Sequence, residues 1–350
     1  LMTQTEIVLL ELVKCGLGLQ TPQLPEFSID WDKLFELSAR QGVLCICLDA
    51  IAHMPIDKKP PKDILMKWIG TVLHSERLYE HHKNLLRSLC TNLKGVHVLL
   101  LKGIGLSGYY PIPKHRPTGD IDIISYGQHK RIDSYFEQIG YKPIQTIEKH
   151  TIVTIDQVII ENHSIYVDAY ATKAENHLQA YLETMCDDKL QEDGYYVPSP
   201  IKNYLFLLSH TIRHFSEYQS ITLRHILDWG LFLKGENEEI MRQWTLIKEK
   251  LNEFGLSRCN DLFTDIAQDF VRFDLSSFII SEVSKVEKDK ILSDILKYKE
   301  VVEHNSIFPR IWHKCRRLYA NRWKFDYLPF SFWERIRFSV LLHWKHVEKI

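Results

Sequence analysis

Two aspartates separated by a single residue carry the clearest chemical signal in the sequence. Asp120 and Asp122 lie in the segment Gly-Asp-Ile-Asp-Ile-Ile that begins at Gly119. Its β-branched isoleucines favour a strand, and alternation along a strand places both carboxylates on one face. Two like charges this close raise each other's pKa unless a cation lies between them. The pair therefore predicts a site for Mg²⁺, which prefers oxygen ligands, with Mn²⁺ as the alternative. The competing interpretation is a solvated strand end with two surface acids.

The segments on either side of the pair supply further polar groups. An apolar run, Val96–Leu101, precedes Lys102 and Gly103, and the alternating segment Ser164–Tyr170 contains a third acid, Asp168. We therefore expect one constellation, made of a glycine turn, the strand with both aspartates and a later strand with the third carboxylate.

This constellation resembles the nucleotidyltransferase superfamily of DNA polymerase β type. More closely, the chain from about residue 30 to about residue 300 resembles the family of uncharacterised bacterial nucleotidyltransferases. The segments that carry this resemblance are Leu100 with Lys102 and Gly103, then Arg116, Gly119–Asp122, and Leu223–Trp229.

The resemblance implies a Mg²⁺-dependent transfer of an NMP from an NTP, ATP included, to a hydroxyl group of an acceptor by two-metal in-line displacement. Asp120 and Asp122 are then metal ligands, and Asp168 ligates the catalytic metal and favours deprotonation of the hydroxyl. Lys102, Gly103 and Arg116 are expected to bind the triphosphate. The acceptor is unknown; a small molecule or a protein is favoured over a nucleic acid.

A second class of function is open, in which a nucleotidyltransferase fold works chiefly by binding. Examples are a toxin–antitoxin-type partner or a regulator with little or no catalysis. Gly103 is followed by Ile104, whereas the superfamily commonly has Ser or Gly there, and this departure favours the binding interpretation. The presence of all three carboxylates favours catalysis.

The spacing of Gly103, Gly105 and Gly108 also matches the G-x-G-x-x-G fingerprint of dinucleotide-binding proteins. That fingerprint requires a helix of about three turns after the third glycine. Three prolines between residues 111 and 117 exclude such a helix, so we reject a nicotinamide or flavin site.

A later helical segment is rich in histidine and arginine. His210 and His214 are four residues apart, and Arg224 follows in the segment that ends near Asp228. One interpretation, which the resemblance supports, is that His210, His214 and Arg224 contact the nucleotide across a cleft. A zinc pair is disfavoured because Thr211 stands where zinc proteases carry an acid. The third interpretation is an interior network in which Arg224 pairs with Asp228 one helical turn on.

The periodicity of apolar residues predicts an α+β protein. We expect an N-terminal helical region over 1–94, a nucleotidyltransferase-like core with a small mixed sheet over 95–198, and a C-terminal helical region over 199–350. The seven cysteines are scattered, and no apolar run has the length of a membrane helix. These features predict a cytoplasmic protein without a membrane partner or a disulfide framework.

The C-terminal tail is basic and aromatic. From residue 309 onward there are ten Lys and Arg but only three Asp and Glu, interleaved with aromatic side chains. Such a composition suits single-stranded nucleic acid, or acidic lipid if the tail is amphipathic, but it also suits a helical cover whose aromatics pack inward. We favour the cover.

Overall fold

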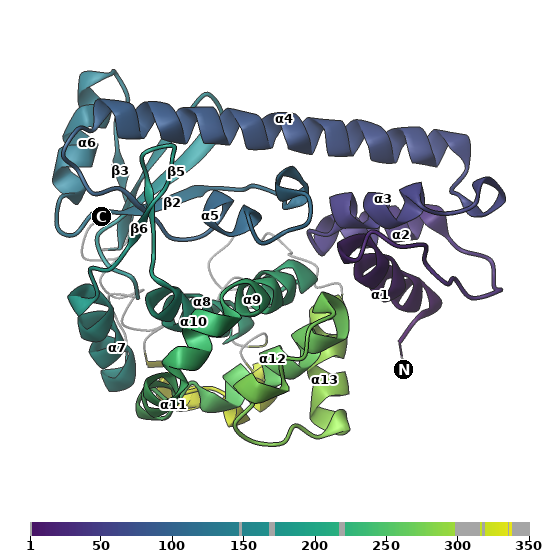
Figure 1. The fold of residues 1–350 in the computed structure, drawn as a ribbon. Coiled ribbons are helices and arrows are strands. Elements are labelled where there is room, and N and C mark those ends of the chain that lie inside the picture. The colour runs from purple at the N-terminus through teal and green to yellow at the C-terminus, as the bar shows by residue number, and fades with distance from the viewer. Residues whose placement is uncertain are drawn as a thin grey trace.

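The computed structural model describes residues 2–146, 149–167, 172–216, 221–297, 316, 319–334 and 336–337. Helices from both ends of the chain surround one mixed β-sheet (Figure 1). The predicted α+β fold class is therefore confirmed. None of the helices in these ranges is long and apolar enough to cross a lipid bilayer.

The N-terminal region contains three short helices and one long helix. They are α1 (Gln4–Leu17), α2 (Trp31–Arg40), α3 (Leu44–Ala52) and α4 (Lys62–Asn92). The sequence predicts a single helix over 31–54, but the structure divides it at Gly42, which has a φ of 67°. Figure 1 shows α4 running from the sheet to the N-terminal helices. Trp68 of α4 joins these parts because its Nε1 donates to the carbonyl oxygen of Leu44 at 2.9 Å.

Seven strands in the described residues form the sheet, in the order β3-β4-β5-β2-β1-β7-β6. Their bounds are β1 (Leu99–Leu100), β2 (Ile121–Ile124), β3 (Ile144–Gln145), β4 (His150–Ile155), β5 (Val158–His163), β6 (Lys189–Leu190) and β7 (Tyr196–Val197). The sequence predicts a hairpin turn at Asp156 and Gln157, and in the structure these residues join β4 to β5 and both have positive φ. The described part of the strand predicted over 165–170, residues 165–167, is not in a strand.

The two faces of the sheet have different character. One face packs its branched side chains against α4 and α6 (His129–Gln138), and Ile123, Ile160 and Phe136 are fully buried there. β2 runs parallel to β5 with Asp122 opposite Glu161, and β4 runs antiparallel to β5 with His150 opposite His163. Because opposed residues share a face, these four polar side chains project from the other side of the sheet.

Apart from the short α5 (Ile104–Ser107), which packs against α4, the remaining helices lie on that polar side (Figure 1). They are α7 (Lys173–Thr184), α8 (Pro200–Ser216), α9 (Leu223–Gly235), α10 (Asn237–Arg242), α11 (Trp244–Glu253), α12 (Ser257–Val271) and α13 (Lys285–Leu296). Short 3₁₀ helices occur at Ile56–Lys58, Pro113–His115, Ser276–Phe278 and Arg322–Asp326. One apolar core contains side chains of α1–α3 and of α8, α9 and α12, so the two helical ends of the chain pack together. Our division at residues 94 and 198 stays a prediction.

The described part of the C-terminal tail packs against the helices. Lys324 is fully buried, and its Nζ lies 3.0 Å from the carbonyl oxygen of Phe215 and 2.7 Å from Oδ2 of Asp294. The ring of Trp323 packs edge-on against Phe215. This part of the tail therefore covers α8, as the cover interpretation expects; the rest of the tail lies outside the described residues.

Candidate metal and nucleotide site

A cleft of about 550 Å³ separates the sheet from the helices. Its polar lining brings together residues that are far apart in the sequence. Eight of the residues predicted as site residues line it: Lys102, Gly103, Arg116, Asp120, Asp122, His210, His214 and Arg224. Asp168, the ninth, lies outside the described residues.

Asp120 and Asp122 share one cationic neighbour. The Nζ of Lys102 lies 3.0 Å from Oδ1 of Asp122 and 3.9 Å from Oδ2 of Asp120. Both carboxylates thus project from one face, and the interpretation as two independent surface acids is wrong. Asp122 is 1% exposed, whereas the Asp120 side chain is 39% exposed at the cleft.

Burial and charge act differently on the three groups. Burial opposes ionisation of Asp122, but the Lys102 ammonium and a His163 hydrogen bond outweigh it and hold the pKa of Asp122 below its usual range. Burial and the neighbouring Asp122 charge raise the pKa of Asp120. Burial works against the ammonium of Lys102, but the two aspartates outweigh it and raise its pKa. Of the two aspartates, Asp122 is thus the one whose ionised form is more strongly stabilised.

Three further side chains near Asp122, those of His163, Glu161 and His150, are not among the predicted site residues. His163 Nε2 lies 3.1 Å from Oδ1 of Asp122 and 3.2 Å from Oε2 of Glu161. His150 Nε2 lies 3.7 Å from Oε1 of Glu161. The hydrogen bond from His163 lowers the pKa of Glu161, and burial lowers the pKa of His150. The sequence predicts a strand over 157–162 and a turn at 163–164, whereas β5 extends to His163, so Glu161 and His163, two apart, share a face as the aspartates do.

The acidic part of this cluster fits a divalent cation. One oxygen each from Asp120, Asp122 and Glu161 lies within 4.8 Å of the other two. Oδ2 of Asp122 is buried and has no hydrogen-bond partner among the described residues. A buried carboxylate oxygen without a partner is costly, and coordination of a cation would satisfy it.

Arg116 is engaged by another acid. Its Nε and Nη2 donate to the two carboxylate oxygens of Asp228, each at 2.8 Å, and the Tyr110 hydroxyl donates to Oδ1 of Asp228 at 2.8 Å. The interior network predicted for Asp228 therefore exists, but Arg116 supplies it and not Arg224. The Nε of Arg224 is buried without a hydrogen-bond partner among the described residues.

The opposite wall of the cleft carries a group of histidine side chains. The Nε2 atoms of His210 and His214 are 3.1 Å apart, and the ring of His210 stacks on Phe206. Burial lowers the pKa of His210 well below its usual range and that of His225 to about 3. In the described part of the chain, His210 and His214 are not in any group of three potential metal ligands. The wall therefore suits contacts with a base or ribose better than it suits zinc.

A comparison with protein families finds one match. Residues 28–272 match the family described as "Uncharacterised nucleotidyltransferase". The chain belongs to this family. No curated protein and no solved structure matches the chain. Membership of this family suggests that the protein is a transferase and that its substrate is a nucleotide.

The glycine turn of this nucleotidyltransferase-family protein departs from the commoner Gly-Ser motif. Gly103 has a φ of 62°, which favours glycine, and it precedes the four-residue helix α5. Between Gly108 and β2 the helical segment is the 3₁₀ helix Pro113–His115, so the three-turn helix that the dinucleotide-binding fingerprint requires after the third glycine is absent from this described part of the chain. Ile104 is 5% exposed and packs in the core. No hydroxyl is therefore available at this position, and main-chain amides must serve any phosphate that binds here.

Proposed function

We propose that this chain is a metal-dependent nucleotidyltransferase that moves an NMP from an NTP to a hydroxyl group of an acceptor. The observation that carries the proposal is the convergence of Asp120, Asp122 and Glu161 within 4.8 Å at a cleft of about 550 Å³. This volume is within the range of small-molecule sites. We further propose that the chain belongs to the DNA polymerase β-type superfamily and is a cytoplasmic bacterial protein.

In this proposal the three carboxylates hold Mg²⁺ or Mn²⁺. A bound divalent cation stabilises negative charge on the reacting phosphate and lowers the pKa of a ligated hydroxyl. Asp122, whose ionised form is stabilised by Lys102 and His163, provides the permanent ligand. Asp168 stays a proposed additional ligand that assists deprotonation of the acceptor.

Lys102 contributes positive charge to the binding of the triphosphate. Its ammonium lies on the two aspartates, in the position where a cation would neutralise them. A bound metal would compete with Lys102 for these oxygens and leave the ammonium available to a phosphate. The turn at Gly103 adds main-chain N–H groups.

The helical wall orients the nucleoside. Arg224 has a buried Nε without a partner among the described residues, so an anionic or carbonyl oxygen of a ligand can satisfy it. His210 and His214 offer rings for hydrogen bonds or stacking on a base. Arg116, bound to Asp228 through two hydrogen bonds, holds the shape of the wall.

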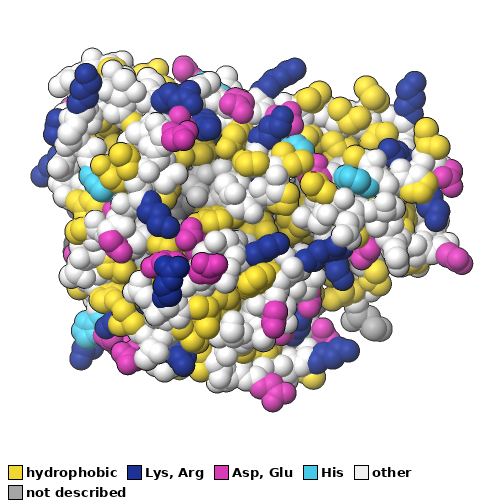
Figure 2. Space-filling view, in the orientation of Figure 1, with side chains coloured by type: hydrophobic (Ala, Val, Ile, Leu, Met, Phe, Trp, Pro, Cys, Tyr) yellow, Lys and Arg dark blue, Asp and Glu magenta, His cyan; other side chains and the backbone are white. Residues whose placement is uncertain are grey.

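For the acceptor we favour a small molecule or a protein. Figure 2 shows basic and acidic side chains interspersed on the face that it draws, whereas a polynucleotide requires a continuous basic surface. The alternative function, a nucleotide-binding protein with weak or no turnover, is favoured by Ile104, which fills the position of the phosphate-binding hydroxyl.

Pyrophosphate release separates the two functions. Purified protein with each of the four NTPs and Mg²⁺ or Mn²⁺ should release pyrophosphate when small-molecule and protein fractions are supplied as acceptors. Asp122→Asn should abolish release. Asp156→Asn, which changes the same residue type in the exposed β4–β5 turn, should not. If the wild type binds nucleotide but releases no more pyrophosphate than Asp122→Asn, the binding function is correct.

A further inference from the structure

Two potential metal-binding groups lie side by side on the polar face of the sheet. One contains Asp120, Asp122 and Glu161, and the other contains His150, Glu161 and His163. They share Glu161, whose two oxygens point to different histidines: Oε1 is 3.7 Å from His150 and Oε2 is 3.2 Å from His163. The strand register explains this arrangement, because β5 lies between β2 and β4.

The separations between the polar atoms match those around a metal ion. Ligand atoms at about 2.1 Å from one cation lie about 3.0–3.5 Å from each other. His163 Nε2 is 3.1 Å from Oδ1 of Asp122 and 3.2 Å from Oε2 of Glu161. His150, Glu161 and His163 each offer one ligand atom within 4.8 Å of the other two, so a small rearrangement brings two imidazole nitrogens and one carboxylate oxygen to the same cation.

Unsatisfied polar atoms gather at the same place. The buried Nδ1 atoms of His150 and His163, like Oδ2 of Asp122, have no hydrogen-bond partner among the described residues. His163 is 5% exposed and Asp122 is 1% exposed, so bulk water cannot readily satisfy them. Buried polar atoms usually have a partner, so the unpartnered Oδ2 of Asp122 points to a cation. The Nδ1 atoms lie across each ring from the Nε2 atoms that approach Glu161, so this cation does not account for them.

We propose that His150, Glu161 and His163 form a second cation site of mixed nitrogen and oxygen ligands, bridged to the aspartate site by the Glu161 carboxylate. The inference rests on the proposed function, because it places the second cation beside the nucleotide cleft. Imidazole ligands favour borderline transition metals, whereas Mg²⁺ prefers oxygen. The site therefore takes Mn²⁺, Co²⁺ or Zn²⁺ in preference to Mg²⁺.

Mn²⁺ alone is the probe that tests this site. We expect the full-length protein to bind two equivalents of Mn²⁺, and pulsed electron paramagnetic resonance to detect ¹⁴N coupling from imidazole on the bound ion. His150→Gln should weaken binding of one equivalent at least tenfold. His177→Gln, an exposed histidine of α7, is the matched control and should bind like the wild type.

The outcomes distinguish this inference from the proposed function. If wild-type protein shows a thermal shift with Mg²⁺ and a non-hydrolysable NTP but bound Mn²⁺ has no ¹⁴N coupling, the nitrogen site is wrong and the proposed function stands. If the thermal shift is absent while ¹⁴N-coupled Mn²⁺ binds, the metal site stands and the nucleotide function fails. Should His150→Gln not fold, the wild-type spectrum still decides.

Discussion

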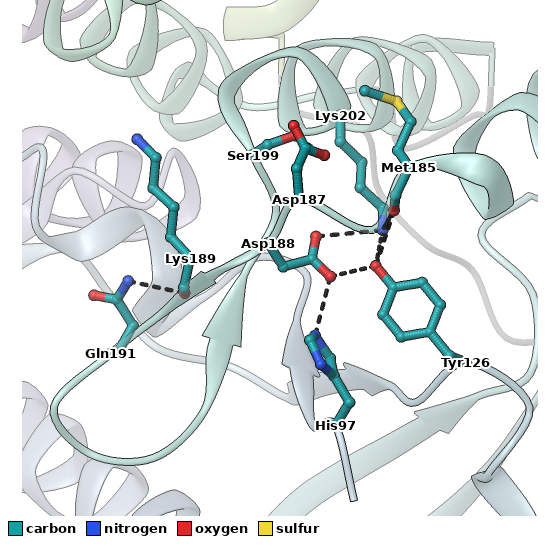
Figure 3. Close-up of polar contacts among 9 residues, drawn as sticks. All are labelled: His97, Tyr126, Met185, Asp187, Asp188, Lys189, Gln191, Ser199 and Lys202. Carbon is teal, nitrogen blue, oxygen red and sulfur yellow. Dashed lines mark hydrogen bonds and ion pairs between the residues drawn. The ribbon is translucent and has the colours of Figure 1, made fainter.

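Two clusters in this protein combine a lysine, an aspartate and a histidine, and they differ in how completely their polar atoms are satisfied. Lys202 of α8 is fully buried; its Nζ donates to the carbonyl oxygen of Met185 at 2.8 Å and lies 3.3 Å from Oδ1 of Asp188 (Figure 3). Tyr126 donates to Asp188 and contacts Lys202, and His97 Nε2 lies 3.0 Å from Oδ2 of Asp188. Both carboxylate oxygens of Asp188 therefore have partners.

The cluster around Lys102 is open by contrast. Asp122 retains a buried oxygen without a partner among the described residues, and Asp120 faces the cleft. Burial lowers the pKa of Lys202, whereas at Lys102 the two aspartates outweigh burial and raise the pKa. The residues around Lys202 thus hold α8 against the sheet, whereas the same residue types around Lys102 include a carboxylate oxygen that a ligand can still bind. An unsatisfied oxygen, more than the presence of charges, indicates the binding site.

The largest expected effect comes from breaking the closed cluster. Lys202→Ala leaves the fully buried Asp188 carboxylate without its cation, which costs about 3–5 kcal/mol in the free energy of unfolding. Urea denaturation measures this loss. Lys102→Ala, at the open cluster, should lower the free energy of unfolding by clearly less. If the two variants lose equal free energy of unfolding, the proposed difference between the two clusters is wrong.

A smaller effect is expected from pH. Burial lowers the pKa of His225 to about 3 in the folded protein, whereas its ordinary value is 6.5. Between pH 3 and pH 6.5 the unfolded chain therefore binds more protons than the folded protein does. The free energy of unfolding should fall as pH decreases from about 6.5 towards 3, by about 1–2 kcal/mol between pH 7 and pH 5. His225→Gln should flatten this part of the curve, measured by denaturation at each pH. An unchanged slope would mean that this imidazole is not held neutral.

The smallest expected effect concerns the open cluster alone. Lys102→Met should weaken the binding of an NTP with Mg²⁺ about tenfold, or about 1.4 kcal/mol, because one charge-assisted phosphate contact is lost. Calorimetric titration measures the dissociation constant. Nucleotide binding equal to that of the wild type would show that Lys102 only neutralises the aspartates.

What the sequence predicted correctly depends on neighbouring residues. The shared face of Asp120 and Asp122 follows from strand alternation, and the β4–β5 turn follows from Asp156, a residue type that tolerates positive φ, between two predicted strands. The prediction of one continuous helix over 31–54 was wrong at Gly42, where the chain turns. A Cβ added at Gly42 would lie 3.2 Å from the Cβ of Arg224. That close approach involves a residue far along the chain.

What the sequence missed depends on distant pairings. Glu161 joins the aspartates because β5 lies parallel to β2, a register that local periodicity does not reveal. Helical spacing suggested that Arg224 pairs with Asp228. In the structure the hydrogen bonds to Asp228 come from Arg116, which lies 112 residues earlier in the chain. Both errors concern which of several suitable side chains the tertiary fold brings close.

The measurement that tests the central claim most directly is the melting temperature with Mg²⁺ and a non-hydrolysable NTP. A ligand at 100 times its dissociation constant adds about 2.7 kcal/mol to the free energy of unfolding, which raises the melting temperature of the wild type by several degrees. The double variant Asp120→Asn with Asp122→Asn should lose this shift, whereas Asp156→Asn should retain it. A wild type without a shift at millimolar nucleotide in Mg²⁺, Mn²⁺ or Ca²⁺, or a double variant that keeps the shift, would contradict a metal and nucleotide site at these carboxylates.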